Sequence, residues 1–223
     1  MREAEGIRLS KRLAEQLPCS RREAEWYIEG GWVRVDGETV ETPGARVAPR
    51  QRVELAPGAR AEPIAPATLL VHQPAGVDAH TLLRPENLCT EGGPPQRFLQ
   101  AHLRHLHCAA PLPPSASGLV VYTQDARVAR KLREDPVEHE CTAEVTGQIA
   151  PAGLPALRPL KASWQSERRL RLAFQGEREG EIGAQCAALG LHVQALRRLR
   201  LGRISLAQLP EGQWRYLLPW ERF

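Results

Sequence analysis

The chain has 223 residues, 42% of them apolar, and a net charge of +4, so it can hold one medium-sized domain with a buried core and a smaller second one. Its five cysteines include no Cys-x-x-Cys pair, which argues against a disulfide framework and a ribbon-type zinc site and is typical of the reducing cytosol. No apolar run approaches the ~18 residues of a membrane span. Because the first residues also lack the apolar core of a signal peptide, we expect a cytoplasmic protein without membrane association.

The first part of the chain predicts two short helices. Leu9, Leu13 and Leu17 recur at four-residue spacing, which places them on one face of a helix. Ser20 and Glu23 have the spacing of a capping box, in which the serine hydroxyl accepts from the Glu23 amide while the glutamate side chain reaches back. A second helix is therefore expected to begin directly after Ser20.

The second predicted helix is followed by a small β-sheet. Gly30-Gly31 is expected to end the helix. Residues 32–40 alternate apolar and polar side chains around Asp36-Gly37, which is the pattern of a β-hairpin with a tight turn. Residues 53–55 predict one further short strand.

The rest of the chain predicts a linker and a second domain. Residues 56–68 lack periodicity and contain several prolines, so they are expected to form a semi-rigid linker, and residues 85–95 a surface loop. Asp125 has the position of an N-cap for a helix over residues 126–133. Strands are predicted at residues 69–71, 119–122, 170–174, 191–193, 203–206 and 214–218.

The first of these regions, residues 7–55, resembles an S4 RNA-binding domain. The matching residues are Arg8-Leu9, Lys11, Leu13-Ala14-Glu15, Cys19-Ser20-Arg21-Arg22-Glu23-Ala24, Ile28, Gly30, Val33, Val35-Asp36-Gly37 and Pro43-Gly44. Arginine pairs beside a capped helix N-terminus suit phosphate oxygens, although they could equally form an ordinary solvated helical face. With the resemblance we favour RNA binding, and the expected contacts are Arg8, Lys11, Arg12, Ser20, Arg21 and Arg22.

The segment Ser117-Gly118-Leu119-Val-Val-Tyr-Thr123-Gln-Asp125 resembles part of a family signature, that of the S4-domain pseudouridine synthases of the small-subunit rRNA type. The signature reads Gly-Arg-Leu-Asp-x-x-Thr-Ser-Gly-Leu, followed by an apolar strand and Thr-Asn-Asp. Counting back from Ser117, the family's arginine falls on Pro111 and its catalytic aspartate on Pro113. In the family this aspartate attacks the sugar or base of a flipped uridine, or abstracts a proton from it. A proline ring has no oxygen with which to do either.

Other segments of the second domain keep the family's apolar frame and lose its polar groups. The departures are Gln73 and His139 in place of lysines, Cys141 in place of the active-site tyrosine, and Gly180, Gly183 and Ala184 in place of arginines. Residues 196–215 are the best-kept part. The aspartate, its neighbouring arginine, the tyrosine and the cluster of arginines are thus all absent. An error in the alignment could explain one of these four losses, but not all four in separate segments whose surrounding residues still match. The resemblance therefore implies a pseudoenzyme.

Two alternative functions remain open. An active synthase would need a displaced carboxylate, for which Asp78, Asp125 and Asp135 are the candidates, although each is expected at a loop or helix end. A protein-interaction module would have lost RNA binding altogether, which the intact Cys19-Ser-Arg-Arg-Glu23 motif argues against.

Two further chemistries are less favoured than ordinary structural roles. Residues 102–108 contain three histidines and a cysteine, but their spacing does not put all four on one helix face, so a zinc site is not expected. Cys141 could be a nucleophile by type, but no base is placed beside it by the sequence, and a small buried side chain is the safer interpretation.

We therefore expect an α+β protein with an S4 domain of two helices and a small sheet at residues 1–55, a linker at 56–68, and a mixed, mainly antiparallel pseudouridine-synthase-like domain at 69–223. Residues 161–223 carry 11 basic and 6 acidic side chains, so Arg198 and Arg200 are expected to add RNA contacts. The expected function is binding of structured RNA, with rRNA as the partner, by an inactive monomer without cofactor or metal. A role in ribosome assembly or RNA chaperoning would follow.

Overall fold

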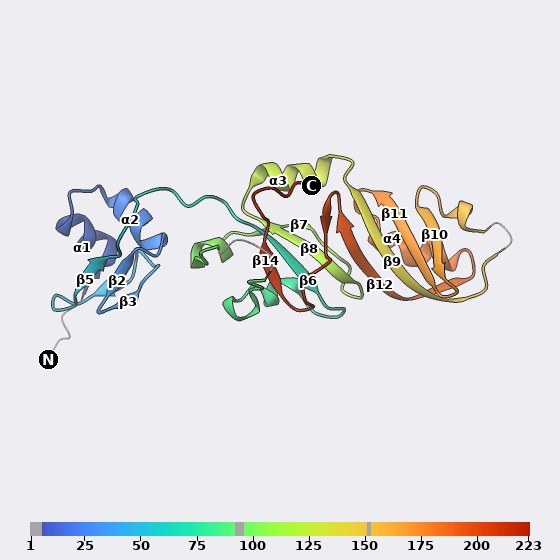
Figure 1. Cartoon of the computed structure of the whole chain (residues 1–223), viewed down its shortest axis with the longest axis horizontal. Helices are drawn as coiled ribbons and strands as arrows, with labels where there is room; N and C mark the ends of the chain where they lie inside the picture. The colour runs from blue at the N-terminus through green and yellow to red at the C-terminus, as the bar shows by residue number, and fades with distance from the viewer. Residues whose placement is uncertain (1–5, 92–95, 151–152) are drawn as a thin grey trace. The chain divides into compact units, whose positions relative to one another are not determined.

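The computed structural model describes residues 6–91, 96–150 and 153–223. The chain forms two compact units, the first containing the chain up to Pro66 together with Arg97–Arg104, and the second containing the remainder from Ala67 onward. Figure 1 follows the chain from the blue N-terminal helices to the red C-terminal strands. Residues 97–104 thus pack with the first unit, whereas the predicted division assigned them to the second domain.

In its described residues, the first unit contains two α-helices, one 3-10 turn and two small antiparallel sheets. Its elements are β1 (Ile7–Arg8), α1 (Leu9–Gln16), α2 (Arg21–Glu29), β2 (Val33–Val35), β3 (Glu38–Thr39), β4 (Arg46–Val47) and β5 (Val53–Leu55). Strand β1 pairs with β4, and β2 lies between β3 and β5. The core of this unit is formed by Leu9, Leu13, Ala24, Ile28, Val33, Val35, Val47 and Val53.

Two local sequence signals set the element boundaries here, and both predictions are confirmed. The Ser20 hydroxyl accepts from the Glu23 amide at 3.2 Å, and the Glu23 carboxylate accepts from the Ser20 amide at 2.7 Å, which completes the capping box of α2. Between β2 and β3, Asp36 and Gly37 have φ angles of 52° and 91°. Left-handed conformations at both central residues give the turn that matches the natural twist of a hairpin.

The second unit is built on a nine-stranded sheet with the order β10-β11-β9-β12-β8-β6-β14, to which β13 adds beside β12 and β7 beside β8. The strands are β6 (Thr68–Gln73), β7 (His107–Ala110), β8 (Ser117–Thr123), β9 (Glu138–Gly147), β10 (Lys161–Ser166), β11 (Arg169–Gln175), β12 (Leu191–Leu201), β13 (Ile204–Ser205) and β14 (Trp214–Tyr216). All pairings between these strands are antiparallel except that of β12 with β8. The sheet is therefore mixed and mainly antiparallel, as expected.

Two α-helices and three of the four short 3-10 turns in the described ranges complete the second unit. The helices are α3 (Ala126–Glu134) and α4 (Glu179–Ala187), and the turns span Ala79–Leu82, Pro85–Asn87, Gln100–Leu103 and Leu154–Leu157, of which Gln100–Leu103 packs with the first unit. Asp125 accepts from the Arg127 amide at 2.7 Å, which confirms it as the N-cap of α3. Part of the predicted surface loop, residues 92–95, lies outside the described residues.

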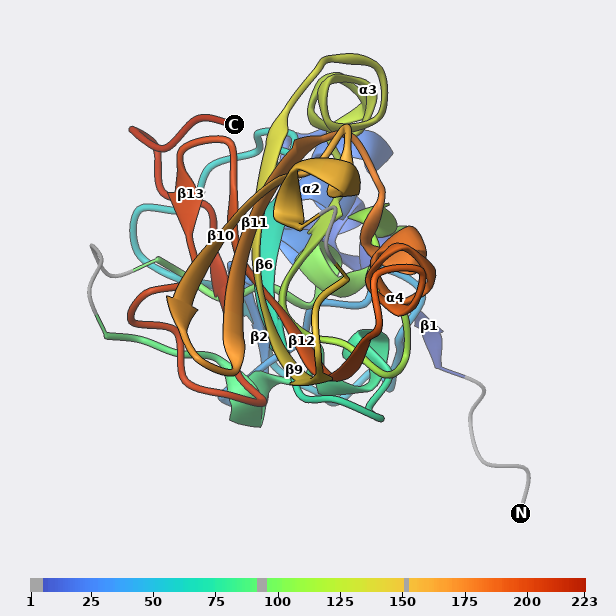
Figure 2. The same ribbon diagram turned by 90° about the vertical axis from the view of Figure 1, so that its right-hand side faces the viewer.

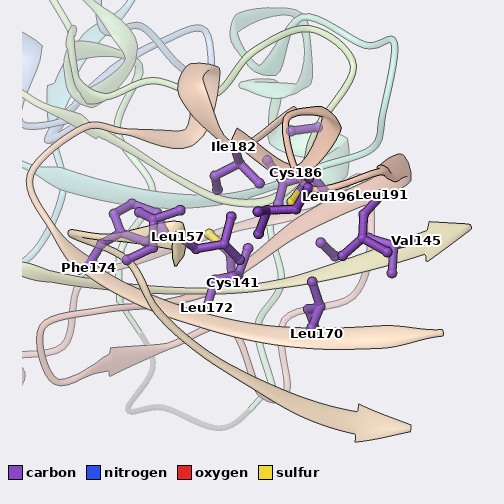
Figure 3. Close-up of a cluster of buried hydrophobic side chains, with 14 residues drawn as sticks. Cys141, Val145, Leu157, Leu170, Leu172, Phe174, Ile182, Cys186, Leu191 and Leu196 are labelled. Atoms are coloured by element: carbon purple, nitrogen blue, oxygen red, sulfur yellow. The ribbon is translucent and has the colours of Figure 1, made fainter. Parts of the chain in front are cut away.

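The main core of the second unit lies between α4 and one face of β9, β11 and β12 (Figure 2). Ile182 and Cys186 of α4 pack there against Cys141 and Leu172 (Figure 3). A second core, which includes Leu132 of α3, fills the space around β7, β8 and β13. None of the helices in the described ranges is long and apolar enough to cross a membrane.

Candidate nucleic-acid interface and the loop at Pro113

The basic side chains predicted to bind RNA in the first unit lie mostly at its surface. Arg8, Lys11, Arg21 and Arg22 are exposed, and Arg12 is partly buried. Lys11 and Arg21 each face a glutamate one helical turn further on, at 3.8 and 3.5 Å. Exposed pairs of this kind contribute about 0–1 kcal/mol and are screened by salt, so both cations can exchange the glutamate for a phosphate.

Two features of α2 orient Arg21 and Arg22, whereas Arg12 of α1 has no such support among the described residues. The guanidinium carbon of Arg22 lies 5.2 Å from the centre of the Trp26 ring, which holds the arginine along the helix surface. Arg12 has a buried Nε that no described residue bonds. Ser20, which was also predicted to contact RNA, uses its hydroxyl to accept from an amide of α2, so in this structure it fixes the start of the helix that carries Arg21 and Arg22.

The loop that should hold the catalytic aspartate, residues 111–116, connects β7 to β8. The chain enters β8 through Gly118, whose φ is 116°. A Cβ atom at this position would lie 2.2 Å from the carbonyl oxygen of Arg198 on β12. Gly118 is therefore required for the close approach of β8 and β12, and this part of the signature has a structural role that does not depend on catalysis.

From inside the protein, Arg198 bonds the chain where it leaves β7 and enters this loop, and again within β8. Its Nε donates to the Leu119 carbonyl at 2.7 Å, its Nη1 to the Pro111 carbonyl at 3.0 Å, and its Nη2 to the Ala110 carbonyl at 2.5 Å. The side chain is 0% exposed. The expectation that Arg198 contacts RNA is therefore wrong for this structure, because the guanidinium is enclosed and its donors are used by the backbone.

A buried carboxylate, which sequence reasoning did not identify, accompanies Arg198. Glu179 of α4 accepts from Arg198 Nη1 at 2.9 Å and lies 2.7 Å from Nδ1 of His139. Burial would raise the pKa of Glu179, but the hydrogen bond from His139 and the positive charge of Arg198 outweigh burial and lower it. Glu179 is thus an ionised partner that stabilises Arg198.

Of the other positions that depart from the family pattern, Cys141 and Gln73 are buried and Gly180 is exposed. Cys141 is 0% exposed within the main core, and burial raises the pKa of its thiol, which favours the neutral thiol over the nucleophilic thiolate. Gln73 is buried and donates to the Ala116 carbonyl at 3.3 Å. Gly180 is exposed on α4, where a Cβ atom would have no neighbouring atom within 4 Å.

The three carboxylates that could have replaced the aspartate lie at helix and turn ends. Asp78 accepts from the His80 amide at 2.9 Å, and Asp125 caps α3. Asp135 pairs with Lys131 at 3.3 Å across the end of the same helix. All three therefore have the structural positions that the sequence predicts for them.

Arg200, the other predicted RNA contact of the second unit, belongs to a network of ion pairs on the sheet surface. Its Nε donates to Glu140 at 2.8 Å and its Nη2 to Glu138 at 2.5 Å. Glu140 also accepts from Arg171 at 2.7 Å, and Arg169 pairs with a glutamate on β9 at 2.8 Å. The positive charge of Arg200 is thus compensated by carboxylates, which disfavours it as a phosphate contact.

The described residues contain no group of three histidine, cysteine or acidic side chains placed to hold a metal ion. A cavity of about 610 Å³ does occur in the second unit, but it lies beside β13, β14 and the C-terminal residues. Neither Pro113 nor Cys141 lines it, so it is separate from the loop at residues 111–116.

In a comparison with known protein families, residues 7–53 match the S4 domain. Over 95% of its length, the chain is 26% identical to two proteins of Escherichia coli K12: dual-specificity RNA pseudouridine synthase RluF, of which the match covers 75%, and ribosomal small subunit pseudouridine synthase A, of which it covers 96%. A crystal structure of a pseudouridylate synthase has the same fold, with a TM-score of 0.57 and 19% identity over 95% of this chain and 96% of that one.

The chain therefore combines an S4 domain with a mixed-sheet domain of the pseudouridine synthase fold. Over nearly its whole length it is similar to RNA pseudouridine synthases, one of which is named for the small ribosomal subunit.

Proposed function

We propose that this protein binds structured RNA on a pseudouridine synthase scaffold without catalysing the isomerisation of uridine. The proposal rests on the alignment of the signature: counted back from Ser117, the family's aspartate falls on Pro113, in a loop whose first residue, Pro111, is bonded to the buried Arg198. The candidate replacements Asp78, Asp125 and Asp135 serve as caps or pair with a lysine. The isomerisation begins with attack or proton abstraction by a carboxylate, and under this proposal that carboxylate is missing.

RNA binding would be carried by the S4 domain. Its exposed cations Arg8, Lys11, Arg21 and Arg22, with the partly buried Arg12, would contact backbone phosphates, which position the protein without reading sequence. Ribosomal RNA is the proposed partner, since one homologue is named for the small ribosomal subunit. An rRNA partner would place the protein in the cytoplasm, where a monomer could act in ribosome assembly or as an RNA chaperone.

The experiment that tests this function pairs two measurements on the same RNA. Release of tritium from C5-labelled uridine in bulk rRNA measures isomerisation, and filter binding of that rRNA measures affinity. We expect binding without tritium release. Release that is abolished by Asp78→Ala, Asp125→Ala or Asp135→Ala would show that a displaced carboxylate has rebuilt the active site.

A charge-reversal pair assigns the binding to the S4 domain. Arg21→Glu/Arg22→Glu should weaken binding at least tenfold and reduce its salt dependence, because phosphate contacts release counterions. The matched control is Arg127→Glu/Arg130→Glu, which makes the same change of net charge at exposed positions of α3. Equal losses in both variants would mean that net charge alone, and not the S4 surface, attracts the RNA.

A further inference from the structure

The strand that carries Arg198 also presents an arginine to solvent. Arg197 is the preceding residue of β12 and is exposed, whereas Arg198 is buried, because successive side chains of a strand point to opposite faces. Its Cα partners are Ser117 at the start of β8 and Thr142 on β9. Arg197 therefore lies directly beside the point where the loop of residues 111–116 joins the sheet.

A buried histidine holds this guanidinium in place. Nη2 of Arg197 lies 3.1 Å from Nε2 of His72, and Nδ1 of His72 lies 2.7 Å from the Leu209 carbonyl oxygen. A carbonyl can only accept, so Nδ1 carries the proton and Nε2 offers its lone pair to Arg197. Burial and then the nearby charge of Arg197 lower the pKa of His72, against hydrogen bonding and the charge of Glu211. The histidine is neutral at pH 7.

This anchor orients Arg197 without neutralising it. The other arginines on the same surface of β9, β11 and β12, namely Arg169, Arg171 and Arg200, each pair with a glutamate. Among the described residues, no carboxylate forms an ion pair with Arg197. Arg197 is therefore the arginine of these three strands that has no carboxylate partner among the described residues, and the neutral histidine that holds it leaves guanidinium donors free.

We propose that Arg197 binds a phosphate of the RNA backbone next to the 111–116 loop, and that His72 is its positioning residue. The inference rests on the proposed RNA-binding function and names a contact of the second unit. A guanidinium with a fixed orientation suits a phosphate, because its planar fork can donate two parallel hydrogen bonds to the phosphate oxygens. Arg198 and Arg200, by contrast, serve the fold.

The test uses the full-length protein and a structured fragment of rRNA, with filter binding measured over a range of salt concentrations. Arg197→Ala should weaken binding by roughly tenfold near 0.1 M salt and reduce the slope of log K against log salt by about one. Arg169→Ala is the matched control, since it removes one exposed charge from the same sheet surface and should change neither quantity appreciably. Arg197→Lys should recover part of the affinity.

A second variant tests the positioning role. His72→Ala keeps the charge of Arg197 and should lose affinity with little change in the salt slope, because a freed side chain loses more conformational entropy on binding. Thermal unfolding of each variant establishes that it is folded. If Arg197→Ala binds like the parent while Arg21→Glu/Arg22→Glu does not, the Arg197 contact is disproved and the S4 function stands. If the parent protein itself does not bind the RNA, both proposals fail.

Discussion

Arg198 and Glu179 form an ion pair at 2.9 Å with side chains that are 0% and 3% exposed. The pair joins β12 to α4, and through the carbonyls of Ala110, Pro111 and Leu119 it also joins both to the end of β7, to the start of the loop of residues 111–116 and to β8. Buried ion pairs add little net stability compared with apolar packing, but removing one partner leaves a charge without compensation. This relationship makes the pair a sensitive point of the fold.

Arg198→Met should lower the free energy of unfolding by about 3–5 kcal/mol, since Glu179 loses its ion-pair partner and keeps only its hydrogen bonds with His139 and the Arg178 amide, while three carbonyls lose their donor. Glu179→Gln preserves the side-chain shape and one acceptor, so it should cost less. Urea denaturation of both variants measures the difference. Equal stabilities of the parent and Arg198→Met would show that the loop is held by other contacts.

Stability should depend on pH through Glu179. Its pKa is lowered in the folded protein, so its ionised form stabilises the fold above the pKa of an unfolded glutamate, about 4.3. That contribution is lost as the pH falls below this value toward the lowered folded pKa. The unfolding free energy of the parent should therefore fall more steeply than that of Glu179→Gln between about pH 5 and pH 3. Parallel curves would contradict the assignment.

Gly118 and Gly183 should respond oppositely to the same substitution. Gly118→Ala places a methyl group against the Arg198 backbone at a positive φ and should destabilise the protein by about 3 kcal/mol. Gly183 lies within α4 with open space around it, so Gly183→Ala should stabilise the protein by about 0.5–1 kcal/mol. Thermal unfolding midpoints distinguish the two, and an unchanged midpoint for Gly118→Ala would refute the close-approach explanation.

Arg97→Ala should loosen the segment Arg97–Arg104 from the first unit. The guanidinium carbon of Arg97 lies 4.3 Å from the centre of the Trp32 ring, and Nη2 donates to the Gly31 carbonyl. Loss of both contacts should cost about 1–2 kcal/mol locally. Amide hydrogen exchange should rise at Gly31 and across residues 97–104. Exchange that stays at the parent's rate would mean that the buried Leu99 and the bond from the Gln100 amide to Glu41 hold the segment unaided.

Features that depend on a few neighbouring residues could be predicted from the sequence. The Ser20–Glu23 capping box, the Asp36-Gly37 turn and the Asp125 cap each involve residues at most three positions apart. Arg198 and Arg200 could not be assigned in this way, since strict alternation would place both on the same face. A register shift of β12 against β9 between these two residues gives them different surroundings, and no local pattern marks it.

The partners of the site residues were likewise beyond local inference. Glu179 lies in α4, in which apolar and polar residues do not separate clearly onto two faces, so the sequence does not show that this side chain is buried. His72 and Arg197 are 125 residues apart in the sequence. The family resemblance correctly indicated the sheet domain and the S4 domain. It could not say that the cation available on the sheet would be Arg197 and not its neighbours.

Because Arg97–Arg104 packs with the first unit, this unit, which contains the S4 domain, is formed by two separate stretches of the sequence. A fragment that stops at Pro66 would expose the Trp32 ring face and the surface that Leu99 otherwise covers. Grafting this unit onto another protein would therefore require the eight-residue segment as well, supplied in the same chain or as a separate peptide. An insertion elsewhere in the second unit would leave the S4 unit complete, whereas one between residues 97 and 104 would disrupt it.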